Sequence, residues 1–132
     1  MNIIIEEIVG EFSVCKVAGL AEIDFSAPFC FIGKTDAEIS LVCPTRYVPT
    51  KTLAREDGWR ACRIVGQLDF SLVGVLAGIS KLLADEKIGI FALSTFDTDY
   101  IITKSENFDA ALNTLAKGGY EIRRSTEIKN GA

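Results

Sequence analysis

The stretch from Val65 to Ser80 reads V-G-Q-L-D-F-S-L-V-G-V-L-A-G-I-S, and its pattern decides the fold. The apolar alternation of residues 59–65 predicts a strand that ends at Gly66. From Ser71 onward the apolar residues follow the spacing of an amphipathic helix, which continues to Asp85. This part of the chain is therefore expected to form a strand, a tight polar turn and a helix.

The turn before this helix is a candidate binding site. The first backbone N–H groups of a helix have no partner within it, and the helix dipole places partial positive charge at the same end. An anion such as a carboxylate would be stabilised there. Alternatively, Asp69 or Ser71 only caps the helix and no ligand binds.

The composition is that of a compact globular protein. The chain has 132 residues, of which 48% are hydrophobic and 24% are charged, enough for one domain or two very small ones. Eighteen acidic and fourteen basic residues give a net charge of −4, which argues against a nucleic-acid partner. The chain lacks an apolar stretch of about 18 residues and the features of a signal peptide, so we expect a cytoplasmic protein without a membrane partner.

The chain contains four cysteines and no histidine. The cysteines are well separated and have apolar neighbours, so we expect them to act as small core residues. A zinc site has few ligands to draw on, and the commonest general base is missing. No metal site, cofactor or catalytic residue is therefore predicted.

The first half of the chain is expected to be rich in strands. Residues 3–8 and 12–17 are apolar segments that predict either a strand pair or a strand with a short helical turn. Residues 29–33 and 39–43 flank a turn-forming Lys34-Thr35-Asp36 and predict a hairpin. A polar loop of about a dozen residues follows, as is usual at a domain boundary, and we divide the chain at residue 57.

The second half predicts the order β-α-β-β-α-β, which is the ferredoxin-like α+β sandwich with two helices on one face of an antiparallel sheet. Ser105 is expected to cap the second helix, and Gly118-Gly119 to end it. Small residues in the first helix, Gly74 and Gly78 among them, predict close approach by another element. The expected elements are strand 59–65, helix 71–85, strand 88–94, strand 100–103, a helix from residue 105, and strand 120–123.

Residues 59–120 resemble an ACT domain of the type found in small bacterial tandem-ACT proteins and in CASTOR-type arginine sensors. The resemblance rests on L-D-F-S-L-V-G-V-L-A-G-I-S at residues 68–80 and I-G-I-F-A-L-S-T-F-D-T-D-Y at residues 88–100. Residues 1–57, with F-C-F-I-G-K-T-D-A-E-I-S-L-V-C-P at residues 29–44, resemble the shorter N-terminal ACT-like unit of the small bacterial proteins. The resemblance implies two ACT-like domains, 1–57 and 58–132.

The resemblance also implies a function and a site. ACT domains of this type bind a free amino acid between two ACT units and regulate another protein, without being catalysts themselves. By position, the backbone of residues 71–73 would meet the main-chain groups of the ligand, and Thr95, Phe96 and Asp99 would come from the facing unit of a homodimer. The predicted ligand-binding set is Asp69, Phe70, Ser71, Leu72, Val73, Gly74, Thr95, Phe96, Asp97 and Asp99.

Two other function classes stay open on the sequence alone. The chain could be a structural or protein-interaction module that dimerises and binds no ligand. It could also be an enzyme that uses Asp69, Asp97 and Asp99 as an acid/base set, although no nucleophile or phosphate-binding motif accompanies them. Asp97 and Asp99 are also residues that turns favour for their local backbone bonds.

Overall fold

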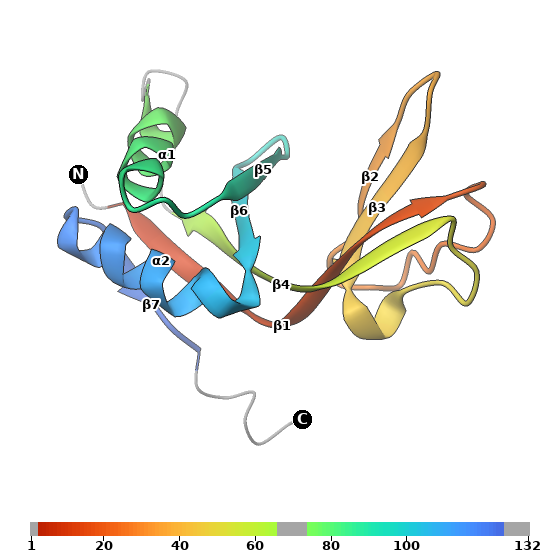
Figure 1. Ribbon diagram of the computed structural model, residues 1–132, viewed down its shortest axis with the longest axis horizontal. Coiled ribbons are helices and arrows are strands. Elements are labelled where there is room, and N and C mark those ends of the chain that lie inside the picture. The colour runs from red at the N-terminus through yellow and green to blue at the C-terminus, as the bar shows by residue number, and fades with distance from the viewer. Residues whose placement is uncertain (1–2, 66–73, 126–132) are drawn as a thin grey trace. The chain divides into compact units, whose positions relative to one another are not determined.

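The computed structural model describes residues 3–65 and 74–125 (Figure 1). Its elements are, in order, β1 (Ile4–Val17), β2 (Phe31–Lys34), β3 (Ile39–Pro44), the 3-10 helix η1 (Thr45–Tyr47), β4 (Ala54–Val65), α1 (Val75–Asp85), β5 (Ile90–Ser94), β6 (Asp99–Lys104), α2 (Ser105–Lys117) and β7 (Glu121–Arg123). The fold is therefore of the α+β class. None of the helices in the described ranges has the length and apolar character needed to cross a membrane.

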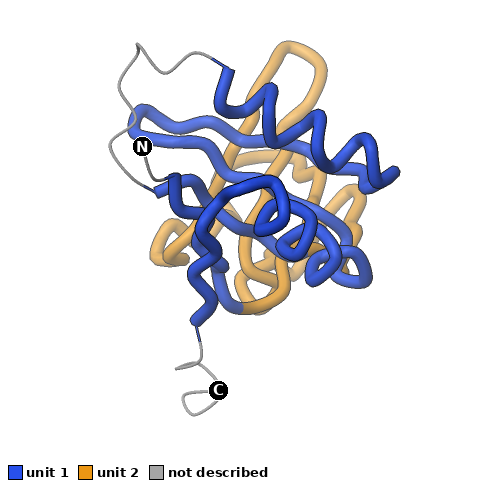
Figure 2. The backbone as a smooth tube through the Cα atoms, turned by 90° about the vertical axis from the view of Figure 1, so that its left-hand side faces the viewer, with its two compact units in different colours: residues 1–9, 60–132 blue, residues 10–59 orange. Residues whose placement is uncertain are grey.

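Backbone contacts divide the chain into two compact units, which Figure 2 colours separately. Unit 1 consists of residues 1–9 and 60–132, and unit 2 consists of residues 10–59. The C-terminal edge of unit 2 lies close to the boundary expected at residue 57. Residues 1–9, however, pack with the C-terminal part of the chain rather than with the segment that follows them.

Two strands, β1 and β4, contribute to both units, because each runs past a unit boundary. Residues 4–17 were expected to form two separate segments, and they form a single strand. Gly10, at the unit boundary, has φ +101°, and Gly58 occupies the corresponding place in β4 with φ +88°. Glycine adopts this left-handed conformation without the steric cost that a side chain would add.

Unit 1 has the strand order β1-β4-β6-β5. The sequence of elements from β4 to β7 is the expected β-α-β-β-α-β, and β5 and β6 form the expected antiparallel hairpin. The strand β7 differs from the expectation of a wholly antiparallel sheet. It pairs in parallel with β1, with Ile4 opposite Glu121, so the N-terminal strand lies between β4 and β7.

The core of unit 1 lies between the sheet and both helices. Figure 1 shows α1 and α2 together on one side of the strands of this unit. One apolar cluster joins buried residues of both helices to buried residues of β1, β4 and β6, which places the helices on the same face of the sheet, as expected. The largest buried members are Ile5, Ile64, Ile79, Leu83, Ile101, Phe108, Leu112 and Leu115.

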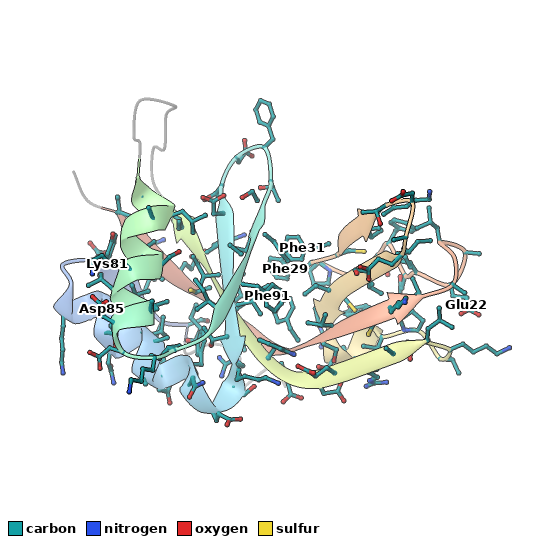
Figure 3. All side chains as sticks on the ribbon, turned by 45° about the horizontal axis from the view of Figure 1, so that its top comes forward. Glu22, Phe29, Phe31, Lys81, Asp85 and Phe91 are labelled. Carbon is teal, nitrogen blue, oxygen red and sulfur yellow. The ribbon has the colours of Figure 1, made fainter. Side chains whose placement is uncertain are left out.

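Unit 2 has the strand order β2-β3-β1-β4 and contains no α-helix within its described residues. The expected hairpin is confirmed, with Phe31 opposite Val42 and Lys34 opposite Ile39. Its core is small and is built from Cys15, Val17, Ile23, Leu41 and Cys43. The ring of Phe29, in the segment before β2 (Figure 3), packs 5.9 Å from that of Phe12.

The cysteines behave largely as predicted from sequence. Cys15, Cys43 and Cys62 are buried, Cys30 is half-buried, and all four are free thiols. Burial raises the pKa of Cys62 to about 12, and burial together with neighbouring cysteines raises that of Cys43 to about 12. Both thiols therefore stay protonated at neutral pH and serve packing rather than nucleophilic chemistry.

The beginnings of both helices differ from the prediction. The first helix was expected to start at Ser71, but α1 begins at Val75, and its N-cap is Gly74 with φ +89° rather than Asp69 or Ser71. A left-handed residue cannot continue a right-handed helix, so Gly74 sets the start. Ser105 is the first residue of α2 and not its cap, because the N-cap is Lys104.

Two smaller expectations also change. The predicted polar loop is shorter than expected, because β4 begins at Ala54. Close packing is found at Gly78, where an added Cβ would lie 3.2 Å from the hydroxyl of Tyr120, but not at Gly74, which has open space around it. Gly74 is therefore required for backbone conformation and not for packing.

Candidate functional site

The turn between β5 and β6 is ordered by a threonine. The backbone N–H of Thr95 donates to the carbonyl of Thr98 at 2.8 Å, and the Thr95 hydroxyl donates to the same carbonyl at 3.1 Å. The Thr98 N–H donates back to the Thr95 hydroxyl at 3.3 Å, and the Thr98 hydroxyl donates to the carbonyl of Ile64 in β4. These bonds fix the turn against the end of β4.

A depression of about 450 Å³ lies beside this turn. Strands β1, β4 and β6 and the turn itself provide its walls, which carry acidic, basic and hydroxyl groups. The lining residues are Glu6, Arg63, Ile64, Val65, Thr95, Asp97, Thr98 and Tyr100. Both signs of charge therefore meet in one open concavity.

Two charged groups of the depression, Glu6 and Arg63, belong to a hydrogen-bonded network. Arg63 Nε donates to Glu6 Oε1 at 2.8 Å, and Arg63 also donates to the Tyr100 hydroxyl at 3.4 Å. Arg123 lies 3.6 Å from the other oxygen of Glu6. The hydrogen bonds with Tyr100 and Glu6 raise the pKa of Arg63, so its guanidinium remains charged at any pH at which the protein folds.

The predicted site residues fall into three groups. Asp69, Phe70, Ser71, Leu72 and Val73 lie outside the described residues. Thr95 and Asp97 line the depression. Phe96 and Asp99 do not line it: Phe96 is 93% exposed at the tip of the turn, and Asp99 accepts a hydrogen bond from the hydroxyl of Ser94 across the hairpin.

Gly74 occupies the start of α1, where no side chain caps the helix and the first turn carries no acidic residue. The N-terminal end of this helix therefore offers backbone donors and a favourable dipole without a competing carboxylate from the helix itself.

Sequence reasoning missed Glu6, Arg63 and Tyr100. They lie on three different strands, and only the pairing of those strands brings them together. The available signal was weak, because each is a polar residue at a half-buried position of its strand. Such a position is the normal place for a polar residue and does not by itself mark a site.

A second charged cluster in unit 1 has a structural character. Glu7, which is buried, accepts hydrogen bonds from Arg60 at 2.6 Å and from Arg124 at 3.2 Å. Arg60 stacks 4.4 Å above the ring of Phe108 in α2. Burial alone would raise the pKa of Glu7, but the hydrogen bonds and charge of Arg124, with further hydrogen bonds from Arg60 and the Ser125 N–H, lower it overall. This cluster ties β1, β4 and α2 together.

No group of three or more cysteine, aspartate or glutamate side chains in residues 3–65 and 74–125 is placed to hold a metal ion.

Comparison with protein families gives one match. Residues 54–117, from the beginning of β4 to the end of α2, match the model of the ACT domain family. The matched segment is just under half of the chain, and it contains the hairpin turn with Thr95 and Asp97. This part of the chain is thus similar to an ACT domain, as its sequence motifs indicated.

Comparison with solved structures shows that the fold is shared over nearly the whole chain. A protein from Agobacterium tumefaciens superposes with a TM-score of 0.85 at 25% identity, and the match covers 96% of both chains. A Vibrio cholerae protein of unknown function, described as a possible transport protein, gives a TM-score of 0.70 at 18% identity over 88% of this chain and 89% of that one.

A third solved structure comes from a regulatory protein. The ligand-free regulatory subunit of aspartate kinase from Thermus thermophilus superposes with a TM-score of 0.63 at 11% identity, covering 87% of this chain and 96% of that one. At this level of identity the likeness concerns the fold alone. It shows that the fold of this chain also occurs in a regulatory subunit.

Proposed function

We propose that this chain is a non-catalytic regulatory module that binds a free amino acid in the depression beside the β5–β6 turn. The observation that carries the proposal is the presence of opposite charges, on Arg63 and Asp97, in one concavity whose turn belongs to the segment similar to an ACT domain. A free amino acid carries one carboxylate and one ammonium group, and charge-assisted hydrogen bonds from such a site suit both.

In the proposed complex, the α-carboxylate docks on the backbone N–H groups of residues 71–73, as the resemblance to ACT domains implies, and Arg63 adds positive charge in the depression. Asp97 holds the ammonium group or a basic side chain, a role that the sequence motif assigned to Asp99. Asp99 is half-buried and accepts a hydrogen bond from the Ser94 hydroxyl, so we propose that it stabilises the hairpin.

The ligand would be enclosed by a second copy of the chain. The depression is open, and Phe96 projects from the adjacent turn with 93% of its surface exposed. A large apolar side chain in this position suits insertion against a partner. We therefore propose a homodimer in which the ligand lies between ACT units, with Phe96 of one copy closing the site of the other.

We also propose that unit 2 is a shortened ACT-like unit. Both units place their strands in the same topological order, since β2-β3-β1-β4 in unit 2 corresponds to β5-β6-β4-β1 in unit 1. In unit 2, residues 18–30 and η1 stand where unit 1 has helices. The four free thiols suit a reducing compartment, so we place the protein in the cytoplasm.

The direct test is thermal melting of the protein against each of the twenty amino acids at millimolar concentration, with light scattering to determine the oligomeric state. A ligand at a hundredfold excess over Kd adds about 2.7 kcal/mol to stability, which moves the midpoint by several degrees. A selective shift together with a dimer supports the proposal. The absence of any shift contradicts it.

Variants locate the site. Asp97→Asn should abolish the ligand-induced shift and leave the unliganded midpoint within about a degree, because Asp97 is exposed. Asp85→Asn is the matched control: Asp85 is an exposed aspartate on α1 that pairs with Lys81, away from the depression (Figure 3). Asp99→Ala tests the sequence-based assignment, and a complete loss of binding with normal folding would restore Asp99 as the ligand contact.

The alternative is a dimerisation module that binds no ligand. The exposed Phe96 would serve either function, so it does not separate them. A stable dimer whose melting is unaffected by all twenty amino acids, but which dissociates in Phe96→Ala, would favour this alternative.

A further inference from the structure

The hairpin turn of unit 2 repeats three hydrogen bonds of the turn of unit 1. Thr35 N–H donates to the Glu38 carbonyl at 2.9 Å, against 2.8 Å for Thr95 and Thr98. Glu38 N–H donates to the Thr35 hydroxyl at 3.2 Å, against 3.3 Å for the corresponding pair in unit 1. The two turns therefore present the same backbone geometry at the same place in the same strand order.

A cavity accompanies the turn in unit 2, as it does in unit 1. It has a volume of about 370 Å³, and its walls are the end of β1, the β2–β3 turn and Leu53, which precedes β4. In unit 1, the corresponding walls are the end of β4, the β5–β6 turn and β1. Because β1 and β4 exchange places between the two units, the two cavities occupy equivalent positions.

The cavity of unit 2 also carries both signs of charge. Lys16 in β1 lies opposite Ser40 in β3, and the Ser40 hydroxyl donates to Glu38 Oε1 at 3.1 Å. Lys16 in β1 and Glu38, in the turn two residues before Ser40, thus stand on the same face of the sheet. Lys34 and Asp36 add a second pair at the turn. Across the described part of the chain, no ion pair joins any of these four side chains to another residue.

One wall differs in chemistry between the two units. Where unit 1 has Glu6, unit 2 has Leu53, whose residue is 64% exposed. Leu53 and Ala18 also line an adjoining cavity of about 810 Å³, which continues along residues 18–22 and 50–53. Its charged members are Glu22, labelled in Figure 3, and Lys51. The cavity at the turn and the larger one thus share Ala18 and Leu53 in their linings.

We infer that unit 2 holds a second small-molecule site, which takes an α-amino acid with an aliphatic side chain. Lys16 receives the carboxylate, Glu38 receives the ammonium group, and the side chain lies against Leu53 and Ala18. Charge-assisted hydrogen bonds orient the head group, and the apolar wall selects the side chain. The class of ligand rests on the proposed function of unit 1, but the site and its residues are separate from it.

The test is a nitrogen-15 NMR titration of the full-length chain with L-alanine, L-valine, L-leucine and L-isoleucine in turn. At least one of them should shift the amide signals of Ala18, Ala37, Glu38 and Leu53 in a saturable way. Lys16→Gln, an exposed substitution, should weaken that binding at least tenfold. Arg46→Gln is the matched control, because Arg46 is an exposed cation of unit 2 outside both of its cavities.

The outcomes separate the two proposals. If only the amides of Thr95 to Thr98 shift, the second site is overturned and the proposed function of unit 1 stands. If only the amides of unit 2 shift, the second site stands, and the ligand site of unit 1 is decided by the melting test with all twenty amino acids. The second site is overturned if none of the four amino acids shifts the amide signals of either turn. It is also overturned if Lys16→Gln leaves the shifts in unit 2 unchanged.

Discussion

Unit 1 and unit 2 share a strand order and a hairpin turn, but they are covered in different ways. Two helices close the core of unit 1, and they bury Ile79, Leu83, Phe108, Leu112 and Leu115. Unit 2 has a loop segment and one turn of 3-10 helix in the same places, and its buried residues include Phe12 and Leu41 beside two cysteines. The comparison teaches that the order of the four strands does not depend on the helices.

What the two units have in common is local. In each, a threonine at the end of a short strand binds the residue three positions later through both its backbone and its hydroxyl. Turns of this kind fix the register of a hairpin. The covering layer can then vary, provided that it buries one face of the sheet.

The largest effect is expected from removing residues 1–9. Ile5 is fully buried in the core of unit 1, and Glu7 is bonded to Arg60 and Arg124. A fragment of residues 58–132, the domain expected from sequence, should therefore fail to fold, with narrow amide dispersion in NMR spectra. Adding a peptide of residues 1–12 should restore dispersion. A fragment that folds alone would show that the N-terminal strand is dispensable to unit 1.

Core truncations should cost more in unit 1 than in unit 2. Leu112→Ala removes a buried side chain between a helix and the sheet, where we expect a loss of about 4 kcal/mol, near the upper end for this substitution. Leu41→Ala in unit 2 should cost about 2 kcal/mol, because a loop can collapse into the space left. Urea unfolding measures both, and equal costs would contradict the contrast.

Glu7 gives unit 1 a pH dependence. Its pKa in the folded state lies below the ordinary value, so its stabilising contribution is fully present above about pH 5 and is lost as the pH falls through the lowered pKa. Glu7→Gln should cost about 2 kcal/mol at pH 7, because charged hydrogen bonds to two arginines are weakened. The difference from the natural protein should shrink towards pH 3.

Glu11 provides the control for this experiment, because it is an exposed glutamate of the same strand. Glu11→Gln should leave the free energy of unfolding within about 0.5 kcal/mol at both pH values. A cost at Glu7→Gln that stays constant from pH 7 to pH 3 would rule out the ionised carboxylate as its source.

The smallest effects are expected at the two turns. Thr35→Val and Thr95→Val keep the shape of the side chain and remove the hydroxyl that holds each turn, at a cost of about 1 kcal/mol each. The two costs should agree within about 0.5 kcal/mol, because both hydroxyls accept from the N–H three residues later and both threonines are exposed, although Thr35 also accepts from the N–H of Ala37. Thermal melting of the single and double variants measures this, and a clear inequality would show that the turns differ in energy.

Much of the fold could be predicted because its signals are local. Both hairpins follow from apolar alternation on either side of a polar turn, and the amphipathic spacing located both helices. The start of α1 could not be predicted. A glycine such as Gly74 can lie inside a helix or, with a positive φ, mark the point where the helix begins, and the sequence alone does not distinguish the two cases. The partners of the strands could not be predicted either, because nothing within residues 4–9 specifies pairing with β7.

The candidate site was predictable to the same extent. Thr95 and Asp97 belong to one contiguous turn, and a motif could identify them. Glu6, Arg63 and Tyr100 are brought to that turn by strands from three separate parts of the chain, so their role depends on tertiary structure. The assignment to Asp99 rested on position alone, and its bond to Ser94 could be seen only in the folded hairpin.

The sharing of β1 between the two units has a consequence for synthesis of the protein. Residues 4–9 leave the ribosome before unit 2, yet their partners in the second half of β4 and in β7 emerge only after all of unit 2. Until then, residues 4–9 expose several apolar side chains and have no partner strand, and unpaired apolar segments favour aggregation. We expect the yield of soluble protein to depend strongly on chaperones that shield nascent chains, more so than for a protein whose domains are contiguous in sequence.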